Sequence, residues 1–446
     1  MKIQLSDHFT YGRLIRFTMP SILMTIFTSL YATVDGLFVS NLVGKTAFAA
    51  LNLIYPYLII LGGVGAMLGV GGSALVAKTL GERNIPRARE YFTMMMYLML
   101  LTSVAATVLG IAFLRPVAYL FGATENLMPD VMIYGTVCLI FNTALQAQYT
   151  FQSYLIVAEQ PKLALWVVLA AGVTNMVLDY LFMAVIPMGI AGAALATGLS
   201  QCVAGAAPLI WFLSRKNTSA LRFTKTRFEL RPMLRSCANG ASEMLSSISA
   251  SVTGILYNLQ LIRYAGEDGV AAYGVVMYVN MIFLAVYIGY STGVAPVVSY
   301  HFGAKNHKEL KNLFHRSLRI TAVCSLLMFA TGMLLADPLS RIFVGYDSAL
   351  LAMTVRAFRV YSVSFLLSGV AIFASCFFTA LNDGVTSAII SFMRTLVFQT
   401  AAVMVMPLLW GLDGIWWSVV GSEAMAMATA VFFFYRHRRK FHYAQS

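Results

Sequence analysis

The chain has 446 residues, of which 59% are hydrophobic and only 11% are charged. Because an average soluble domain carries roughly a quarter charged residues, this composition excludes a soluble globular protein and indicates a chain whose main solvent is lipid. The formal net charge of +13 is explained by basic loops on the side of an anionic membrane leaflet. We therefore expect the lipid bilayer as a partner and no nucleic acid.

Twelve apolar stretches of about 20 residues follow one another, each long enough to cross a hydrocarbon core of about 30 Å. They lie near residues 13–39, 50–77, 91–113, 131–157, 163–186, 189–213, 234–262, 271–299, 317–336, 355–381, 385–409 and 413–435. The predicted fold class is an all-α integral membrane protein with about twelve transmembrane helices.

The second six stretches repeat the first six at a spacing of about 222 residues. Gly81-Glu82-Arg83-Asn84 returns as Gly303-Ala304-Lys305-Asn306, and Phe92 returns as Phe314. A repeat this long indicates a duplicated domain. Six helices per half place both halves in the same orientation, as two parallel lobes related by a pseudo-twofold axis, an architecture typical of secondary transporters. The predicted division is an N-terminal lobe at 1–213, a basic cytoplasmic linker at 214–235 and a C-terminal lobe at 236–446.

Lysine and arginine set the orientation, since they are enriched in cytoplasmic loops. They concentrate before the first stretch, between stretches two and three, in the linker, at 305–319 and in the tail at 436–440. Both termini are therefore expected in the cytoplasm, in a multi-pass protein of the cytoplasmic (inner) membrane. The first stretch is of spanning length and serves as the insertion signal, with no cleavable signal pattern.

No motif for an enzyme or a nucleotide site is present. A Gly-x-x-x-x-Gly-Lys-Ser/Thr loop and a His-Glu-x-x-His helix are both missing from the sequence. The five cysteines fall inside spanning stretches without paired spacing, which is typical of small buried residues. We expect no enzymatic activity, no ATP drive and no cofactor.

Four polar side chains in the first half are predicted to reach one depth of the membrane. Asp35 lies near the outer end of the first helix, Asn175 and Asp179 lie one turn apart on the fifth, and Thr197 lies about two turns into the sixth. Two carboxylates, an amide and a hydroxyl suit a small cation such as Na⁺, or a carboxylate pair that shares a proton. The alternative is that these groups only join helices by hydrogen bonds.

The repeat supplies an internal comparison for this cluster. The positions 222 residues after Asn175, Asp179 and Thr197 hold Val397, Ala401 and Val419, and the region matching Asp35 has no acid. A packing requirement common to both halves does not explain a cluster in one half. The cluster is therefore interpreted as specialised for function.

At these residues the sequence resembles the multidrug and toxic compound extrusion (MATE) family, bacterial type, over nearly the whole chain. The resemblance rests on the duplicated lobes and on Pro20, Val34-Asp35-Gly36, the Gly-rich second helix running into Gly81-Glu82, Asn175-x-x-x-Asp179, and Gly289/Gly293/Pro296 running into Gly303-Ala304-Lys305. It implies that Asp35, Asn175, Asp179 and Thr197 form the cation-coupling site of the N-terminal lobe, used by Na⁺, H⁺ or both, so that the four are the metal ligands if the ion is Na⁺. It also implies that Pro20 either fixes a kink or acts as a hinge of the first helix.

The second half carries a different set of charges near mid-membrane: Glu243, Arg394 and Glu423. We expect Arg394 to form a neutralising ion pair with Glu423 or with Glu243. By resemblance, an acid on helix 7 makes Glu243 the better candidate for contacting a cationic substrate. A cavity between the lobes would add candidates that suit organic cations: Tyr31, Asn52, Tyr55, Tyr257, Tyr278 and Asn280.

These observations predict a monomeric antiporter that exports amphipathic, cationic compounds, driven by inward Na⁺ or H⁺. The nearest alternative is a lipid-linked saccharide or lipid flippase of the same superfamily, which would need a more cationic cavity than the single Arg394 provides. A membrane-embedded enzyme lacks a metal-ligand set among the spans, and a channel or receptor does not explain duplicated lobes with a one-sided carboxylate cluster.

Overall fold

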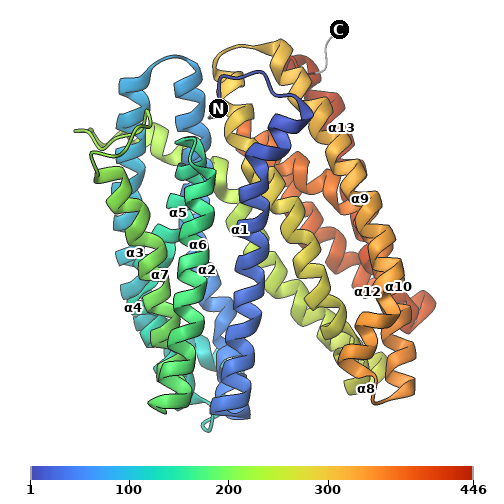
Figure 1. The fold of residues 1–446 in the computed structure, drawn as a ribbon. Helices are drawn as coiled ribbons and strands as arrows, with labels where there is room; N and C mark the ends of the chain where they lie inside the picture. The colour runs from blue at the N-terminus through green and yellow to red at the C-terminus, as the bar shows by residue number, and fades with distance from the viewer. Residues whose placement is uncertain (1–2, 444–446) are drawn as a thin grey trace.

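The computed structural model describes residues 3–443 as a bundle of long helices (Figure 1). Within those residues all regular secondary structure is helical. The first half comprises α1 (Tyr11–Phe38), η1 (Val39–Val43), α2 (Lys45–Gly81), α3 (Ile85–Leu120), α4 (Met128–Ile140), α5 (Asn142–Val157), α6 (Pro161–Asp179), η2 (Tyr180–Val185) and α7 (Ile190–Leu213). The second half comprises α8 (Leu230–Gly303), α9 (His307–Val344), α10 (Ser348–Ala380), α11 (Gly384–Phe392), η3 (Met393–Phe398), α12 (Gln399–Trp410) and α13 (Leu412–Phe441).

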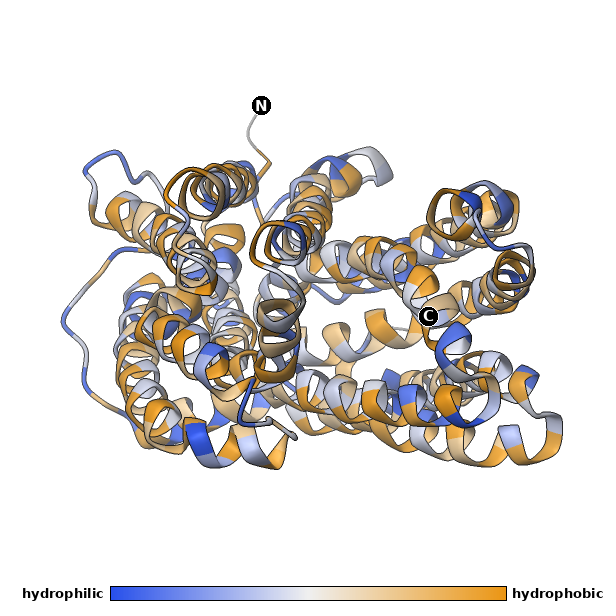
Figure 2. Ribbon diagram, turned by 90° about the horizontal axis from the view of Figure 1, so that it is seen from below, coloured by the Kyte–Doolittle hydropathy of each residue, from blue (hydrophilic) through white to orange (hydrophobic). Residues whose placement is uncertain are grey.

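These elements form twelve membrane crossings. In the described part of the chain, ten helices are long and apolar enough to span a bilayer, and the bent pair α4–α5 makes an eleventh span. The 74-residue α8 is far too long for one crossing at about 1.5 Å per residue, and Gly266 interrupts it with φ 62° and ψ −150°, so it crosses twice. The predicted fold class of two six-helix lobes is confirmed. Seen along the bundle, the helices are mostly hydrophobic and the connecting loops mostly hydrophilic (Figure 2).

The duplication is visible in the backbone as well as in the residues. Arg83 and Lys305 both take left-handed φ angles, 60° and 53°, at the turns that follow α2 and α8. Asn84 and Asn306 then cap the next helices, with side chains that accept from the backbone N–H three residues later. The breaks at Gly44 and Gly266, and at Gly189 and Gly411, also repeat. The two halves therefore turn at equivalent positions.

Three boundaries differ from the sequence prediction. The predicted helix at 131–157 is broken into α4 and α5, which meet at an angle of 51°. The predicted linker at 214–235 overlaps the start of α8 by six residues, because the helix begins at Leu230 and includes Arg231, before the apolar stretch starts at 234. Between the stretches predicted at 234–262 and 271–299, the helix is interrupted only at the non-helical residue Gly266.

The lobes come into backbone contact at the end of the bundle that carries the termini. A Cβ atom built on Gly81 would lie 2.0 Å from the carbonyl oxygen of Tyr300, and one built on Gly303 would lie 1.9 Å from that of Lys78. These two contacts are each other's equivalents under the repeat, so the pseudo-twofold axis passes between them. Only glycine permits backbones to approach so closely.

A second glycine contact lies further along the same two helices. A Cβ on Gly71 of α2 would lie 2.1 Å from the oxygen of Ser236, and one on Gly240 of α8 would lie 1.9 Å from the oxygen of Met67. Toward the opposite end the helices of the two lobes diverge (Figure 1). In this conformation the bundle is closed at the terminal end.

Candidate functional site

The four polar residues predicted to share one depth are all placed inside the first lobe. Asp179 and Asn175 are 0% and 2% exposed on α6, while Asp35 and Thr197 are partly buried on α1 and α7. Asp35 and Asp179 lie within interaction distance of each other. The pair is therefore formed by two helices that pack side by side, α1 and α6.

Polar atoms in this cluster lack hydrogen-bond partners among the described residues. They are Oδ1 of Asp35, Nδ2 of Asn175, both carboxyl oxygens of Asp179 and Oγ1 of Thr197. A buried polar group without a partner is costly, and each such group in a native structure calls for a proton, a water or an ion to satisfy it. The carboxyl and hydroxyl oxygens are hard ligands that fit a small cation, and the paired carboxyls equally fit one shared proton.

The local helix geometry brings Asp179 to this position. Asp179 is the last residue of α6, and the chain continues as the π-helical turn η2. A similar turn, η1, begins four residues after Asp35. Such single π-turns are frequent at functional sites because they re-aim side chains within an otherwise regular helix. Nothing in the local sequence marked these turns.

Two predicted substrate residues belong to the surroundings of this cluster. Tyr31 packs against α6, where its ring lies 3.1 Å from a Cβ built on Gly172, and its hydroxyl accepts a weak hydrogen bond of 3.4 Å from Gln148. Tyr55 of α2 lies in the neighbourhood of Tyr31 and Asp35. Asn52 is exposed, and its amide donates to Phe48 O in its own helix at 2.8 Å. Tyr31 and Tyr55 therefore lie beside the first lobe's own site, whereas Asn52 is not placed there.

Gln148 and Gln152 were not predicted as site residues. Both are uncharged amides within an apolar span. Gln148 contacts Tyr31, and Nε2 of Gln152 is buried without a partner. Polar amides at membrane depth were the available signal, because they favour hydrogen bonding across helices.

The predicted residues of the second lobe are not gathered at one site. Tyr257 is 2% exposed, exchanges a 2.8 Å hydrogen bond with Ser418 and stacks on Tyr273 at 5.4 Å. Tyr278 stacks on Phe343 at 6.0 Å, and Asn280 is buried beside Met277. In this conformation Tyr257 therefore lies within the interior of the second lobe and does not face the other lobe.

Arg394 forms the neutralising ion pair with Glu423 and not with Glu243. The guanidinium contacts both carboxylate oxygens, at 2.9 and 3.0 Å, and the side chains are only 15% and 4% exposed. Arg394 lies in the π-helical turn η3. Each buried charge is satisfied by the other, so the pair offers no free cation at the centre of the lobe.

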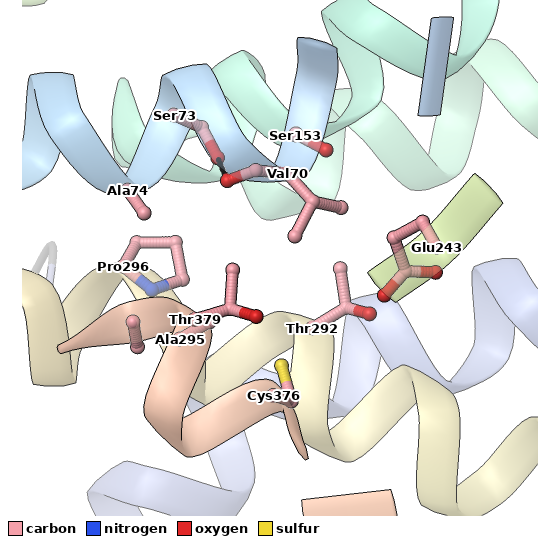
Figure 3. Close-up of a pocket in the computed structure, with 11 residues that line it drawn as sticks. Val70, Ser73, Ala74, Ser153, Glu243, Thr292, Ala295, Pro296, Cys376 and Thr379 are labelled. Atoms are coloured by element: carbon pink, nitrogen blue, oxygen red, sulfur yellow. Dashed lines mark hydrogen bonds between the residues drawn. The ribbon is translucent and has the colours of Figure 1, made fainter. Parts of the chain in front are cut away.

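Glu243 lies at the contact between the lobes, on the wall of a cavity of about 20 Å³. Figure 3 shows its carboxyl group directed toward Thr292 across this cavity, which is also lined by Ser73, Ser153, Cys376 and Thr379. No ion pair of Glu243 is found in residues 3–443. The volume suffices for about one water molecule, so in this conformation the space between the lobes at Glu243 is nearly closed.

Pro20 is buried within α1, which continues through it from Tyr11 to Phe38. Proline leaves one carbonyl of the preceding turn without its helical partner. The helix is therefore weakened at Pro20 while remaining continuous.

Together, the fold and the buried cluster define a two-lobed, multi-pass membrane protein with an ionisable site in one lobe. The MatE family model matches residues 20–181 and again residues 244–405, once in each half and over most of the chain. The chain belongs to the MatE family.

Two curated relatives cover almost the entire chain. The multidrug export protein MepA of Staphylococcus saprophyticus is 24% identical over 425 residues, 95% of this chain and 93% of its own length. MepA of Staphylococcus haemolyticus is 22% identical over 434 residues, covering 96% of this chain and 94% of its own.

The fold is also that of solved structures. A multidrug resistance MATE family transporter of the MOP superfamily in an outward-facing conformation matches with a TM-score of 0.91, 23% identity and 97% coverage of both chains. A MATE structure in the bent conformation matches with a TM-score of 0.90, 22% identity and coverage of 98% of this chain and 97% of that one.

Proposed function

We propose that the protein is an antiporter that exports amphipathic, cationic compounds from the cytoplasm and is driven by inward movement of Na⁺ or H⁺. The observation that carries this proposal is the cluster of Asp35, Asn175, Asp179 and Thr197, whose buried atoms lack partners in the first lobe. The relatives named multidrug export proteins support drug export as the activity.

Coupling follows from how the cluster responds to charge. Two adjacent carboxylates repel when both are ionised and unoccupied, so binding of a cation or a proton relieves that repulsion. Occupancy then changes the relative free energy of the conformations in which α1 and α6 are packed differently. A ligand can shift such an equilibrium only by its differential affinity for the two states. A buried acid pair provides such a difference in affinity.

The proposal also includes the orientation of the protein in the membrane. Lysine and arginine are concentrated at the bundle end that carries the termini, which supports placing that end in the cytoplasm and the protein in the cytoplasmic membrane. Glu243, at the contact between the lobes, is then the acid best placed to meet a cationic substrate when the lobes separate. A monomer suffices, because the site is built within one chain.

A flippase for lipid-linked saccharides is the second candidate, and the structure disfavours it. Binding of a lipid phosphate requires an unpaired cation, whereas Arg394 is satisfied by Glu423 at 2.9 Å. The free acid Glu243 would repel such a ligand.

The test is uphill efflux from proteoliposomes with a Na⁺ gradient and a pH gradient imposed separately. Asp35→Asn and Asp179→Asn remove the ionisable group while preserving shape, so uphill efflux has to be lost while equilibrium binding of a fluorescent cation persists. Asp268→Asn, an exposed acid of α8, is the matched control and has to transport normally. Wild-type uphill efflux by both cluster variants would refute the coupling role.

A further inference from the structure

The segment that precedes α1 connects the two lobes at the terminal end. The backbone N–H of Leu5 donates to Glu159 of the first lobe at 2.8 Å, and that of Phe9 donates to Glu309 of the second lobe at 2.9 Å. His8 contacts the other oxygen of Glu309 at 2.6 Å. Leu5 and Phe9 are 2% and 0% exposed, so this short stretch is a packed part of the lobe contact.

Glu309 is the centre of this attachment. It is 5% exposed near the start of α9, and Asn312 donates to it at 2.9 Å. Asn312 and Arg316 also donate to the carbonyl oxygen of Phe9. Successive turns of α9 therefore bind both the N–H and the C=O of Phe9, which fixes the backbone of the segment.

Starting α1 does not require this contact. Thr10 is the N-cap of α1, and its side chain accepts from the N–H of Arg13. A helix that carries its own cap residue needs no further acceptor from another lobe to begin. The contact with Glu309 therefore contributes to the association of the two lobes.

The repeat supplies a matching contact of opposite polarity. The residue 222 positions before Glu309 is Arg87, near the start of α3. Arg87 contacts Glu229 at 2.6 Å, and Glu229 directly precedes α8, the first helix of the second lobe. In each case the third helix of one lobe holds the entry to the first helix of the other.

The attachment of the N-terminal segment lies beside the point where the lobes touch. Ser6 lines the same pocket as Gly81, Gly303 and His301, and the ring of Phe9 packs edge-on against His301 at 6.5 Å. The segment thus covers the glycine contact that closes this end. Separation of the lobes here requires Phe9 to leave Glu309.

We propose that Glu309 and Arg87 are paired positioning residues that hold the terminal end of the bundle closed, each by binding the entry to the other lobe's first helix. This rests on the alternating access of the proposed function, and both contacts open when that end opens. The Glu309 contact is the stronger of the two, because it is buried while Arg87 and Glu229 are 34% and 39% exposed.

The experiment uses Cys376 as its reporter, since this residue lines the small cavity between the lobes. In a background with the other four cysteines replaced, inside-out vesicles are treated with a membrane-impermeant maleimide. Glu309→Ala is expected to raise the labelling rate about tenfold and Arg87→Ala about threefold. Asp337→Ala, which removes an ion pair within α9 itself, is the matched control and has to label like wild type.

Unchanged labelling of Glu309→Ala in a correctly inserted, monodisperse protein would overturn the proposal, as would an equal increase in Asp337→Ala. If Glu309→Ala does not fold, a thiol cross-link between His8→Cys and Asn312→Cys, which keeps Glu309, has to stop efflux reversibly, and undiminished efflux from the cross-linked protein overturns the proposal. Labelling requires no transported ion. Raised labelling of Glu309→Ala, together with no ion-driven efflux by the wild-type protein, would refute the antiport function and retain the contacts.

Discussion

The glycine contact between α2 and α8 gives a quantitative prediction for the closed end. In Gly71→Ala the new methyl carbon would lie 2.1 Å from the backbone oxygen of Ser236, which is 0.9 Å inside the 3.0 Å that real Cβ contacts respect. Because the obstacle is backbone, no side-chain rotation relieves it, and the two helices have to move apart. Overpacking of this kind costs about 1–3 kcal/mol.

That cost applies only to the conformation in which the helices touch. We therefore expect Gly71→Ala to shift the equilibrium toward the conformation open at the terminal end, by about 5-fold to 150-fold. Gly240→Ala, whose methyl would lie 1.9 Å from Met67 O, should act in the same direction. The double variant should fall short of the sum, because one separation of the helices relieves both clashes.

The assay is the labelling rate of Cys376 in inside-out vesicles, with thermal unfolding of the purified protein measured alongside. Gly63→Ala is the matched control, because Gly63 lies in the interior of the same helix and nothing comes within 4 Å of its added methyl. Equal labelling of the Gly71→Ala and Gly63→Ala variants, both correctly inserted, would refute the view that this contact closes the bundle.

Two further predictions follow from buried charge and from topology. Glu423→Gln leaves Arg394 buried without its counter-ion and should lower the free energy of unfolding by about 3–5 kcal/mol, whereas Arg394→Met combined with Glu423→Leu should recover most of it; equal melting temperatures of all three proteins would contradict this. A cysteine at Lys225, in the loop before α8, should react with an impermeant reagent in inside-out vesicles and not in intact cells, and the reverse pattern would reject the proposed orientation.

The sequence was sufficient to predict the number of crossings and the duplication, because both depend on patterns that extend over many residues. Apolar length identifies a span, and a constant spacing identifies a repeat. The cluster at Asp35 and Asp179 was predictable for a related reason: an ionisable residue inside an apolar span is conspicuous. Helix direction and rise then placed these residues at one depth.

The break between α4 and α5 was not predictable, because its cause is tertiary. Neither proline nor glycine marks the break at Phe141. Instead the ring of Phe141 occupies the space beside Gly198 of α7, 2.1 Å from where a Cβ would be. The bend reflects packing against a residue 57 positions later in the chain.

The attachment of the N-terminal segment was equally hidden. Leu5 and Phe9 carry no motif, and their partners Glu159 and Glu309 lie 154 and 300 residues away. Glu309 itself resembles an ordinary acid in the first turn of a helix, where a negative charge is favoured by the helix dipole. Only its burial and its contacts identify a second role.

Duplication has preserved backbone geometry in this protein more faithfully than charge. Turns, caps and glycine contacts recur at the same spacing, whereas the acids Asp35 and Asp179 have no equivalents in the second lobe and Glu309 is matched by Arg87. Matched backbones allow the two lobes to separate about one axis. Under the proposed function, a cation site confined to one lobe would make the free energy of that movement depend on a single ion-binding event, which is the asymmetry that a coupled transporter requires.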